Sequence, residues 1–204
     1  MSLIYIKEVD GNSILGVWEM DDALESLAKQ SPSTEKLSAP TLKRKKENIA
    51  TRLLMDAMYA GAEINYHASG KPYLLNNEMY ISISHSGNLV CLLLNKSNSV
   101  GVDIQFINPK ITLLKEKFLS KTEIAQLPPE CETDALHIYW GAKEALYKYY
   151  GEENIIFKTR FHIDAFAISN TGKIKGTILS THQKAIIPLH YEKWNDYFLV
   201  YTIE

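Results

Sequence analysis

The stretch WGAKEALYK at 140–148 sets one glutamate between a lysine and small apolar residues. On a helix that turns about 100° per residue, Trp140, Glu144 and Lys148 fall on one stripe. The simplest interpretation is an i, i+4 ion pair that stabilises the helix by roughly 0.2–0.5 kcal/mol. The same stripe is also suited to holding a metal ion and a phosphate group side by side.

A second polar pair stands in GVDIQF at 101–106, which alternates strictly. Two sets of side chains point to opposite faces of the predicted strand. The apolar face carries Val102, Ile104 and Phe106, and the polar face carries Asp103 and Gln105. The polar face either meets solvent or supplies two oxygen ligands. An aspartate carboxylate suits Mg²⁺, which prefers one or two carboxylates together with waters and phosphate oxygens.

Anion-binding groups gather in two further stretches. YISISHSGN at 80–88 brings Ser84 and His85 to the end of a strand, and GKP at 70–72 sets Lys71 in a turn. Such residues are commonly solvated, but hydroxyl, imidazole and backbone N–H groups at a turn also bind anions. The basic cluster KRKK at 43–46 is either an exposed helix face or a site for phosphate or an acidic partner.

The elements that would position these residues occur in the same order twice. The first half is predicted to contain strands at 3–9 and 14–20, helices at 21–30 and from Pro40 to Gly61, then extended segments near 63–67, 72–75, 79–85 and 88–94, with a turn at 86–88. A further strand at 99–106 is predicted to open the second half. The second half is predicted to contain a helix at 111–119, a capping box at 120–123, a long helix over 133–150 that ends at Gly151, and extended segments at 155–168, 173–180, 184–192 and 197–203.

This repeated order predicts an α+β protein of two similar α/β halves, 1–98 and 99–204, in a pseudo-twofold arrangement. Mainly antiparallel strands are expected to pack with one long helix in each half, because the connections are too short for crossovers. The active site is expected between the halves.

Composition favours a packed protein and excludes several classes. The 204 residues are 46% hydrophobic and 23% charged with a net charge of −2, so neither disorder nor nucleic-acid binding is indicated. No apolar run approaches the roughly 20 residues of a membrane helix, and MSLIYIKEVD does not predict a secretory signal. Cys91 and Cys131 lack metal-site spacing and fit a reducing compartment, so a cytoplasmic location is expected.

The order of the motifs is more specific than any one of them. GKP, SISHS, GVDIQ, KFLSKTE and WGAKEALYK, at these separations, resemble the 4′-phosphopantetheinyl transferase superfamily. The length and the two-half layout look like the surfactin-synthetase type. The resemblance implies transfer of the phosphopantetheine arm of coenzyme A to a serine of an apo acyl or peptidyl carrier protein, as in holo-[acyl-carrier-protein] synthases, with release of 3′,5′-ADP.

The resemblance also implies roles for individual residues. Asp103 and Glu144 match metal carboxylates for Mg²⁺, with Mn²⁺ as an alternative, and Gln105 stands where the family usually has glutamate. Glu144 is also the candidate base, and Lys148 matches the lysine that serves the departing phosphate. The residues expected to contact coenzyme A are Arg52, Lys71, Ser84, His85, Lys143 and Lys148.

The expected carrier surface lies in ITLLKEKFLSK at 111–121. Carrier proteins of fatty-acid, polyketide and nonribosomal peptide synthesis present an acidic helix, which apolar anchors rimmed by lysines would suit. The expected contacts are Leu113, Leu114, Lys117, Phe118 and Lys121. An ordinary amphipathic helix is the alternative. Because two fused halves would enclose the site within one chain, a monomer is expected.

Two other functions remain open at this point. The missing carboxylate at Gln105 fits a degenerate homologue that binds coenzyme A or a carrier protein without transfer. A different Mg²⁺-dependent enzyme acting on a nucleotide or pyrophosphate is the second, but the chain has no G-x-x-x-x-G-K-[ST] loop.

Overall fold

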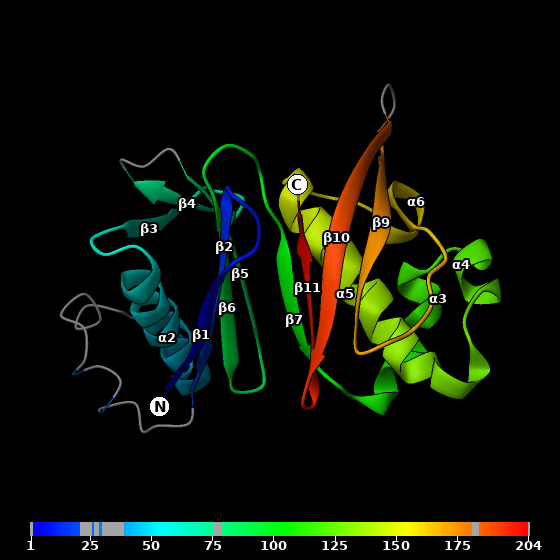
Figure 1. The fold of residues 1–204 in the computed structure, drawn as a ribbon, viewed down its shortest axis with the longest axis horizontal. Coiled ribbons are helices and arrows are strands. Elements are labelled where there is room, and N and C mark those ends of the chain that lie inside the picture. The colour runs from blue at the N-terminus through cyan, green and yellow to red at the C-terminus, as the bar shows by residue number, and fades with distance from the viewer. Residues whose placement is uncertain are drawn as a thin grey trace. The chain divides into compact units, whose positions relative to one another are not determined.

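The computed structural model describes residues 2–20, 26, 29, 39–75, 79–180 and 184–203. The chain divides into two compact units, Met1–Ser99 and Val100–Glu204. Each unit combines an antiparallel sheet with one long helix, so the predicted α+β class is confirmed (Figure 1). The pseudo-twofold relation of the halves stays a prediction. The helix expected at 21–30 lies, apart from Ser26 and Lys29, outside the described residues.

The sheet of the first unit has four antiparallel strands. Their order is β1 (Ser2–Glu8), β2 (Ser13–Glu19), β6 (Leu89–Asn95) and β5 (Tyr80–Ser86). A turn at Gly87 and Asn88 joins β5 to β6, and the φ of 57° at Gly87 favours glycine there. The turn expected at 86–88 is therefore confirmed. A separate antiparallel ribbon pairs β3 (Glu63–Tyr66) with β4 (Pro72–Leu75).

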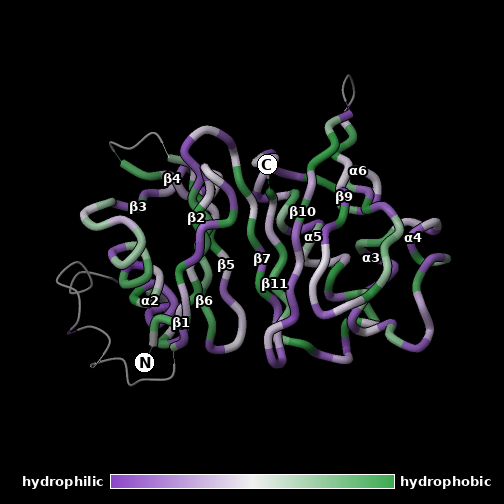
Figure 2. The backbone as a smooth tube through the Cα atoms, in the orientation of Figure 1, coloured by the Kyte–Doolittle hydropathy of each residue, from purple (hydrophilic) through white to green (hydrophobic). Residues whose placement is uncertain are grey.

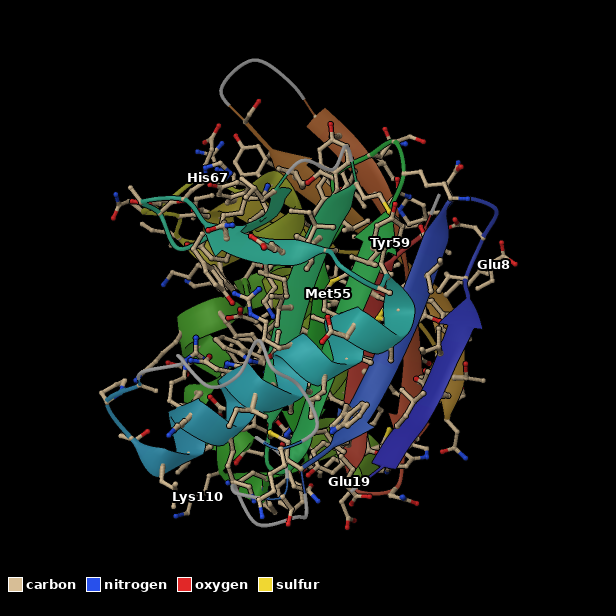
Figure 3. All side chains as sticks on the ribbon, turned by 90° about the vertical axis from the view of Figure 1, so that its left-hand side faces the viewer. Glu8, Glu19, Met55, Tyr59, His67 and Lys110 are labelled. Carbon is tan, nitrogen blue, oxygen red and sulfur yellow. The ribbon has the colours of Figure 1, made fainter. Side chains whose placement is uncertain are left out.

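The long helix of the first unit, α2 (Leu42–Met58), packs on β2 and β6. It begins after Thr41, whose Oγ1 accepts a hydrogen bond from Arg44 N at 3.1 Å, and it ends before Gly61. Figure 3 shows α2 crossing the strands, with Met55 on it and Tyr59 just beyond its end. The alternation of green and purple along α2 in Figure 2 reflects one apolar face, which buries Ile49 and Leu54.

The sheet of the second unit has five antiparallel strands. Their order is β7 (Val102–Phe106), β11 (Tyr197–Thr202), β10 (Lys184–Trp194), β9 (Thr171–Leu179) and β8 (Phe161–Ile163). The long helix α5 (Glu132–Tyr150) packs on β7 and β11. It ends at Gly151, whose φ of 76° gives the predicted left-handed cap. None of the helices in the described part of the chain is both long and apolar enough to cross a membrane.

Short helices complete the second unit. They are η2 (Pro109–Leu114), α3 (Lys115–Phe118), α4 (Lys121–Ala125), η3 (Pro129–Cys131) and α6 (Phe157–Arg160). The predicted capping box is confirmed, because Ser120 and Glu123 bond each other's backbone N–H. The extended segment predicted over 155–168 is wrong at α6. Phe157 and Phe161 are one helical turn apart, and their ring centroids lie 5.4 Å apart.

Candidate active site

Asp103 lies on β7 and its carboxylate faces the long helix α5. The side chain is buried, and each of its oxygens has a partner. Oδ1 lies 2.8 Å from Lys148 Nζ, and Oδ2 accepts a hydrogen bond of 2.8 Å from Gln105 Nε2. The alternation predicted for this strand is therefore correct, and its polar face meets α5 rather than solvent.

Lys148 joins the helix to the strand. Its Nζ donates to Asp103 Oδ1 and, also at 2.8 Å, to the carbonyl oxygen of Val102. The side chain keeps 24% of its surface exposed, so the ammonium stays within reach of a ligand. The flexible four-carbon side chain of a lysine lets the ammonium move from one partner to another, such as a phosphate, while the helix stays in place.

Glu144 stands one helical turn before Lys148 and is half-buried. The pKa of this carboxyl is raised to about 7, chiefly by burial and also by the negative charge of Asp103, while the charge of Lys148 opposes the rise. A carboxyl that exchanges its proton near neutral pH is suited to act as a general base. The hydrogen bonds of Lys148 go to strand β7 rather than to Glu144, since its Nζ bonds Asp103 and the Val102 carbonyl.

Two glycines let the strand and the helix approach this closely. A Cβ at Gly101 would lie 1.8 Å from the carbonyl oxygen of Ala145 in α5. A Cβ at Gly141 would lie 2.7 Å from Val200 Cγ2 and 3.8 Å from Asp103 Oδ2. Any larger side chain at Gly101 would push β7 off the helix and separate Asp103 from Lys148.

The donor set fits Mg²⁺. Asp103 and Glu144 supply two carboxylates whose mutual repulsion a divalent cation would relieve, and Gln105 lies beside them. Gln105 presents its amide nitrogen to Asp103, so ligation by its carbonyl oxygen stays a prediction. Within the described residues no group of three or more His, Cys, Asp or Glu side chains forms a metal cluster. The two carboxylates would rely on phosphate oxygens and water for the remaining ligands.

A second polar cluster lies in the first unit. His85 on β5 contacts Arg44 of α2 through Nε2, and its Nδ1 lies 3.3 Å from Glu47 Oε1. Arg44 also pairs with Glu47 at 3.2 Å. Ser84, next to His85, is buried. Arg44 is thus the residue of the basic run at 43–46 that contacts His85 in the predicted anion-binding stretch.

The other two cations predicted in the first unit have different surroundings. Arg52 donates from its guanidinium to the carbonyl oxygen of Ile64 at 2.7 Å, which ties α2 to β3. Lys71 is half-buried, and burial lowers the pKa of its ammonium. Contact of either residue with coenzyme A stays a prediction.

Comparison with known proteins decides the family. A family model described as the 4′-phosphopantetheinyl transferase superfamily matches residues 99–202, just over half of the chain. This chain belongs to that superfamily. The matched residues are almost the whole second unit, which carries Asp103, Glu144 and Lys148.

Relatives with names agree with this assignment. The 4′-phosphopantetheinyl transferase AcpT of Salmonella typhi is 31% identical over 131 residues, which are 61% of this chain and 68% of the relative. HetI of Nostoc, also named a 4′-phosphopantetheinyl transferase, is 29% identical over 108 residues, 46% of each chain. A Synechocystis protein, provisionally named a 4′-phosphopantetheinyl transferase, is 31% identical over 116 residues, which are 51% of this chain and 47% of the relative. The chain thus spans about half the length of two of these transferases and about two thirds of the third.

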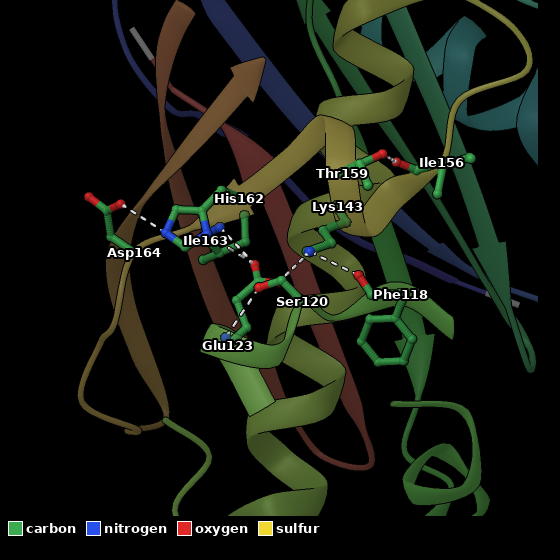
Figure 4. A network of polar contacts seen from close by, with 9 residues as sticks. All are labelled: Phe118, Ser120, Glu123, Lys143, Ile156, Thr159, His162, Ile163 and Asp164. Atoms are coloured by element: carbon green, nitrogen blue, oxygen red, sulfur yellow. Dashed lines mark hydrogen bonds and ion pairs between the residues drawn. The ribbon is translucent and has the colours of Figure 1, made fainter. Parts of the chain in front are cut away.

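The structure does not support the predicted phosphate contact of Lys143. This side chain has no exposed surface, and its Nζ donates to Glu123 Oε2 at 2.8 Å and to the carbonyl oxygen of Phe118 at 2.9 Å (Figure 4). Burial lowers the pKa of its ammonium, and Glu123 raises it. The motif lysine beside Glu144 therefore anchors α5 to α3 and α4 inside the transferase fold.

Four of the five residues of the predicted carrier surface are exposed, and their contact with a carrier stays a prediction. Leu113, Leu114, Lys117 and Lys121 are exposed, Leu113 by 80%. Phe118 is the exception, because only 2% of its surface is exposed. Its ring packs edge-on against Trp140 with centroids 5.1 Å apart, so it supports the surface from below.

Sequence reasoning missed the aromatic cluster around Trp140. The indole stacks on Phe157 of α6 at a centroid distance of 5.7 Å while its other contact is Phe118 of α3. Trp140 lies one turn before Glu144, so one residue of the motif fixes two short helices against α5. The only available signal was the spacing of Trp140, Glu144 and Lys148 on one stripe.

Proposed function

We propose that this chain transfers the 4′-phosphopantetheine arm of coenzyme A to a serine of an apo carrier protein, giving the holo carrier and 3′,5′-ADP. The proposal rests chiefly on one observation. Asp103, Glu144 and Lys148 lie together in the unit that the family model matches. Two carboxylates and a reachable ammonium are the groups that an attack on a pyrophosphate needs.

Each residue of this group has a distinct task in the proposed reaction. The serine oxygen of the carrier attacks the phosphorus that bears pantetheine, and the bond from that phosphorus to the departing 3′,5′-ADP breaks. Glu144 takes the serine proton, for which its pKa of about 7 is suited. Lys148, already oriented by Asp103 and the Val102 carbonyl, stabilises the charge that develops on the departing phosphate.

Asp103 and Glu144, with Gln105 beside them, would hold Mg²⁺ or Mn²⁺. The ion, when bound, supplies positive charge that neutralises the pyrophosphate oxygens. The residues themselves orient one another: Gln105 holds Asp103, and Asp103 holds Lys148. Both contacts would have to adjust when a cation enters.

The first unit would contribute the side chains that bind the coenzyme A phosphates. Ser84, His85 and Arg44 offer a hydroxyl, an imidazole and a guanidinium on neighbouring elements. Lys71 and Arg52 are the further candidates. The site would then lie between the halves 1–98 and 99–204, and one chain would suffice as a monomer of the surfactin-synthetase type.

The carrier protein would meet the exposed surface of η2, α3 and α4. Leu113 and Leu114 offer apolar contacts, and Lys117 and Lys121 offer charges for an acidic helix. Holo-[acyl-carrier-protein] synthase activity in the cytoplasm, with an acyl or peptidyl carrier as substrate, is the specific form of the proposal.

A second candidate function follows from Gln105. The glutamine supplies no charge to the metal site, and it occupies one oxygen of Asp103 with a hydrogen bond. A homologue with this change would bind coenzyme A or a carrier protein without transfer. Its signature is coenzyme A affinity with no modification of the serine.

Intact-mass spectrometry tests the two candidates directly. Apo acyl carrier protein, and separately an apo peptidyl carrier domain, is incubated with the chain, coenzyme A and Mg²⁺. A gain in mass of one phosphopantetheine, lost in Glu144→Ala and in EDTA, supports the transferase. No gain with either carrier, while coenzyme A binds, supports the degenerate homologue.

A further inference from the structure

A pocket of about 680 Å³ lies in the second unit, among residues of α3, α4 and α6. None of Asp103, Glu144 and Lys148 lines it. Its apolar lining comes from Leu119, which is buried, and from Ile124 and Ala125. The motif comparison assigned no role to α6.

The walls of the pocket are held in place before any ligand arrives. Phe157 of α6 packs against Trp140 and, at a centroid distance of 5.5 Å, against Tyr147, so the next residues, Lys158 and Thr159, form one wall. The opposite wall begins at Ser120, whose capping box with Glu123 fixes the start of α4. A site built from such packed elements loses little conformational entropy when it binds.

The rim of the pocket is mainly cationic. Lys121 and Lys158 are exposed on its two walls, and Glu116 is the single carboxylate among the lining residues. Lys117, also exposed, follows Glu116 in α3. Apolar lining with lysines on both walls is complementary to an acidic helix that presents an apolar side chain.

The pocket is connected to the candidate active site through one buried side chain. Lys143, which precedes Glu144, bonds the carbonyl oxygen of Phe118 and the carboxylate of Glu123 (Figure 4). Phe118 is followed by Leu119, which lines the pocket. A partner seated in the pocket would thus lie against the elements that anchor the helix bearing Glu144.

We propose that this pocket receives an apolar side chain from the acidic helix of the carrier protein, and that Lys158 pairs with carboxylates of that helix. The proposal rests on the proposed function and extends it. It adds α6 to the docking surface and makes Lys158 a determinant of carrier choice. The surface formed by Leu113 and Leu114 alone would not require α6.

Direct binding tests the proposal without relying on catalysis. Fluorophore-labelled apo acyl carrier protein, and separately a labelled apo peptidyl carrier domain, is titrated with the full chain and followed by anisotropy. Lys158→Glu and Ala125→Trp, which fills the pocket, are expected to raise the Kd of the carrier about tenfold. Lys175→Glu, an equal charge change on β9, and Ala125→Ser are the matched controls and are expected to leave it unchanged.

Coenzyme A affinity and the melting temperature of each variant separate docking from misfolding, and both are expected to match the wild type. An unchanged carrier Kd in Lys158→Glu and Ala125→Trp would overturn the proposal, and so would failure of the wild type to bind either carrier. Binding that depends on Lys158 in a protein that transfers nothing would retain the docking site and reject the transferase. A small molecule seated in the pocket would leave both carrier affinities insensitive to the substitutions.

Discussion

Lys148 Nζ and Asp103 Oδ1 lie 2.8 Å apart, although the two residues are separated by 45 positions in the sequence. The contact joins the end of the motif helix α5 to the first strand of the second unit. It also places the lysine where it competes with a cation for Asp103. Both partners of this ion pair therefore have a second task in the proposed reaction.

Lys148→Met separates the two tasks. Loss of the ammonium removes the charge that would stabilise the departing phosphate, so kcat for transfer is expected to fall about 10²–10³-fold. Mg²⁺ should bind at least as tightly as before, because Asp103 loses a competitor. Single-turnover transfer and the Mg²⁺-dependent shift in melting temperature measure the two effects. Lys175→Met is the matched control, and an unchanged kcat in Lys148→Met would contradict the role of Lys148.

Gln105→Glu tests the composition of the metal site. The new carboxylate adds a third negative charge beside Asp103 and Glu144 and should strengthen Mg²⁺ binding. The Mg²⁺ concentration that gives half of the maximal rise in melting temperature is therefore expected to fall roughly tenfold. Without Mg²⁺ the variant should be less stable than the wild type, since the hydrogen bond from Gln105 to Asp103 is replaced by repulsion. Thermal unfolding with and without Mg²⁺ measures both, and an unchanged metal requirement would argue against Gln105 as a neighbour of the ion.

Gly101→Ala tests the close approach of β7 to α5. The added methyl group would meet the backbone oxygen of Ala145, which cannot move without the helix, so unfolding is expected to become easier by about 1–3 kcal/mol. Transfer should fall as well, because Asp103 moves away from Lys148. Denaturant unfolding and transfer assays check the prediction. Gly11→Ala, where a Cβ would have nothing within 4 Å, is the control that should change neither.

Features that depend on near neighbours could be predicted from the sequence. The capping box at Ser120, the helix end at Gly151 and the alternation of Asp103 and Gln105 each follow from residues a few positions apart. Their physical causes are local hydrogen bonds, backbone conformation and the two-residue period of a strand. The stripe of Glu144 and Lys148 belongs to the same class.

Features that depend on distant partners could not be predicted in this way. Lys143 resembles a phosphate-binding lysine until Glu123, 20 positions away, is found beside it. Phe118 resembles an exposed anchor until Trp140 covers it, and Arg44 stands in a basic run until His85, 41 positions away, meets it. Burial decides the cases of Lys143 and Phe118, and a contact between an exposed arginine and a distant strand decides that of Arg44. Both are set by the tertiary fold.

Lys143→Met tests whether the buried ion pair anchors α5. Removal of the ammonium leaves the Glu123 carboxylate without its charge partner in the interior, which is expected to cost about 3–5 kcal/mol of stability. The double variant Lys143→Met with Glu123→Gln should be more stable than Lys143→Met alone, because glutamine carries no charge into the interior. Its single amide oxygen can still accept a hydrogen bond from Ser120 N or from Ile163 N, though not from both. Urea unfolding of the two single variants and the double variant measures the coupling. Additive losses would show that the pair does not act as a unit.

His137 gives the second unit a dependence on pH. Its Nε2 accepts a hydrogen bond from Asn108 N at 3.1 Å, and its Nδ1 therefore carries the proton and donates to the carbonyl oxygen of Thr133 at 2.9 Å. Burial is the main cause that lowers the pKa of this imidazole below its usual 6.5; Lys193 lowers it too, while the bond to Thr133 and the charge of Asp134 oppose the shift. The folded state thus favours the neutral form of His137, which lies in α5 and accepts a hydrogen bond from Asn108, the residue just before η2.

The sign of the effect follows from proton binding. Above pH 6.5 His137 is neutral in both the folded and the unfolded chain and adds no pH dependence. As pH falls from 6.5 towards the lowered folded-state pKa, the unfolded chain binds a proton that the folded chain does not, so stability decreases. His137→Asn keeps a neutral acceptor and should show a shallower fall in melting temperature between pH 6.5 and 5. The wild type and the variant share the other five histidines, so these cancel in the comparison. Equal slopes of melting temperature against pH for the two proteins would contradict a buried neutral His137.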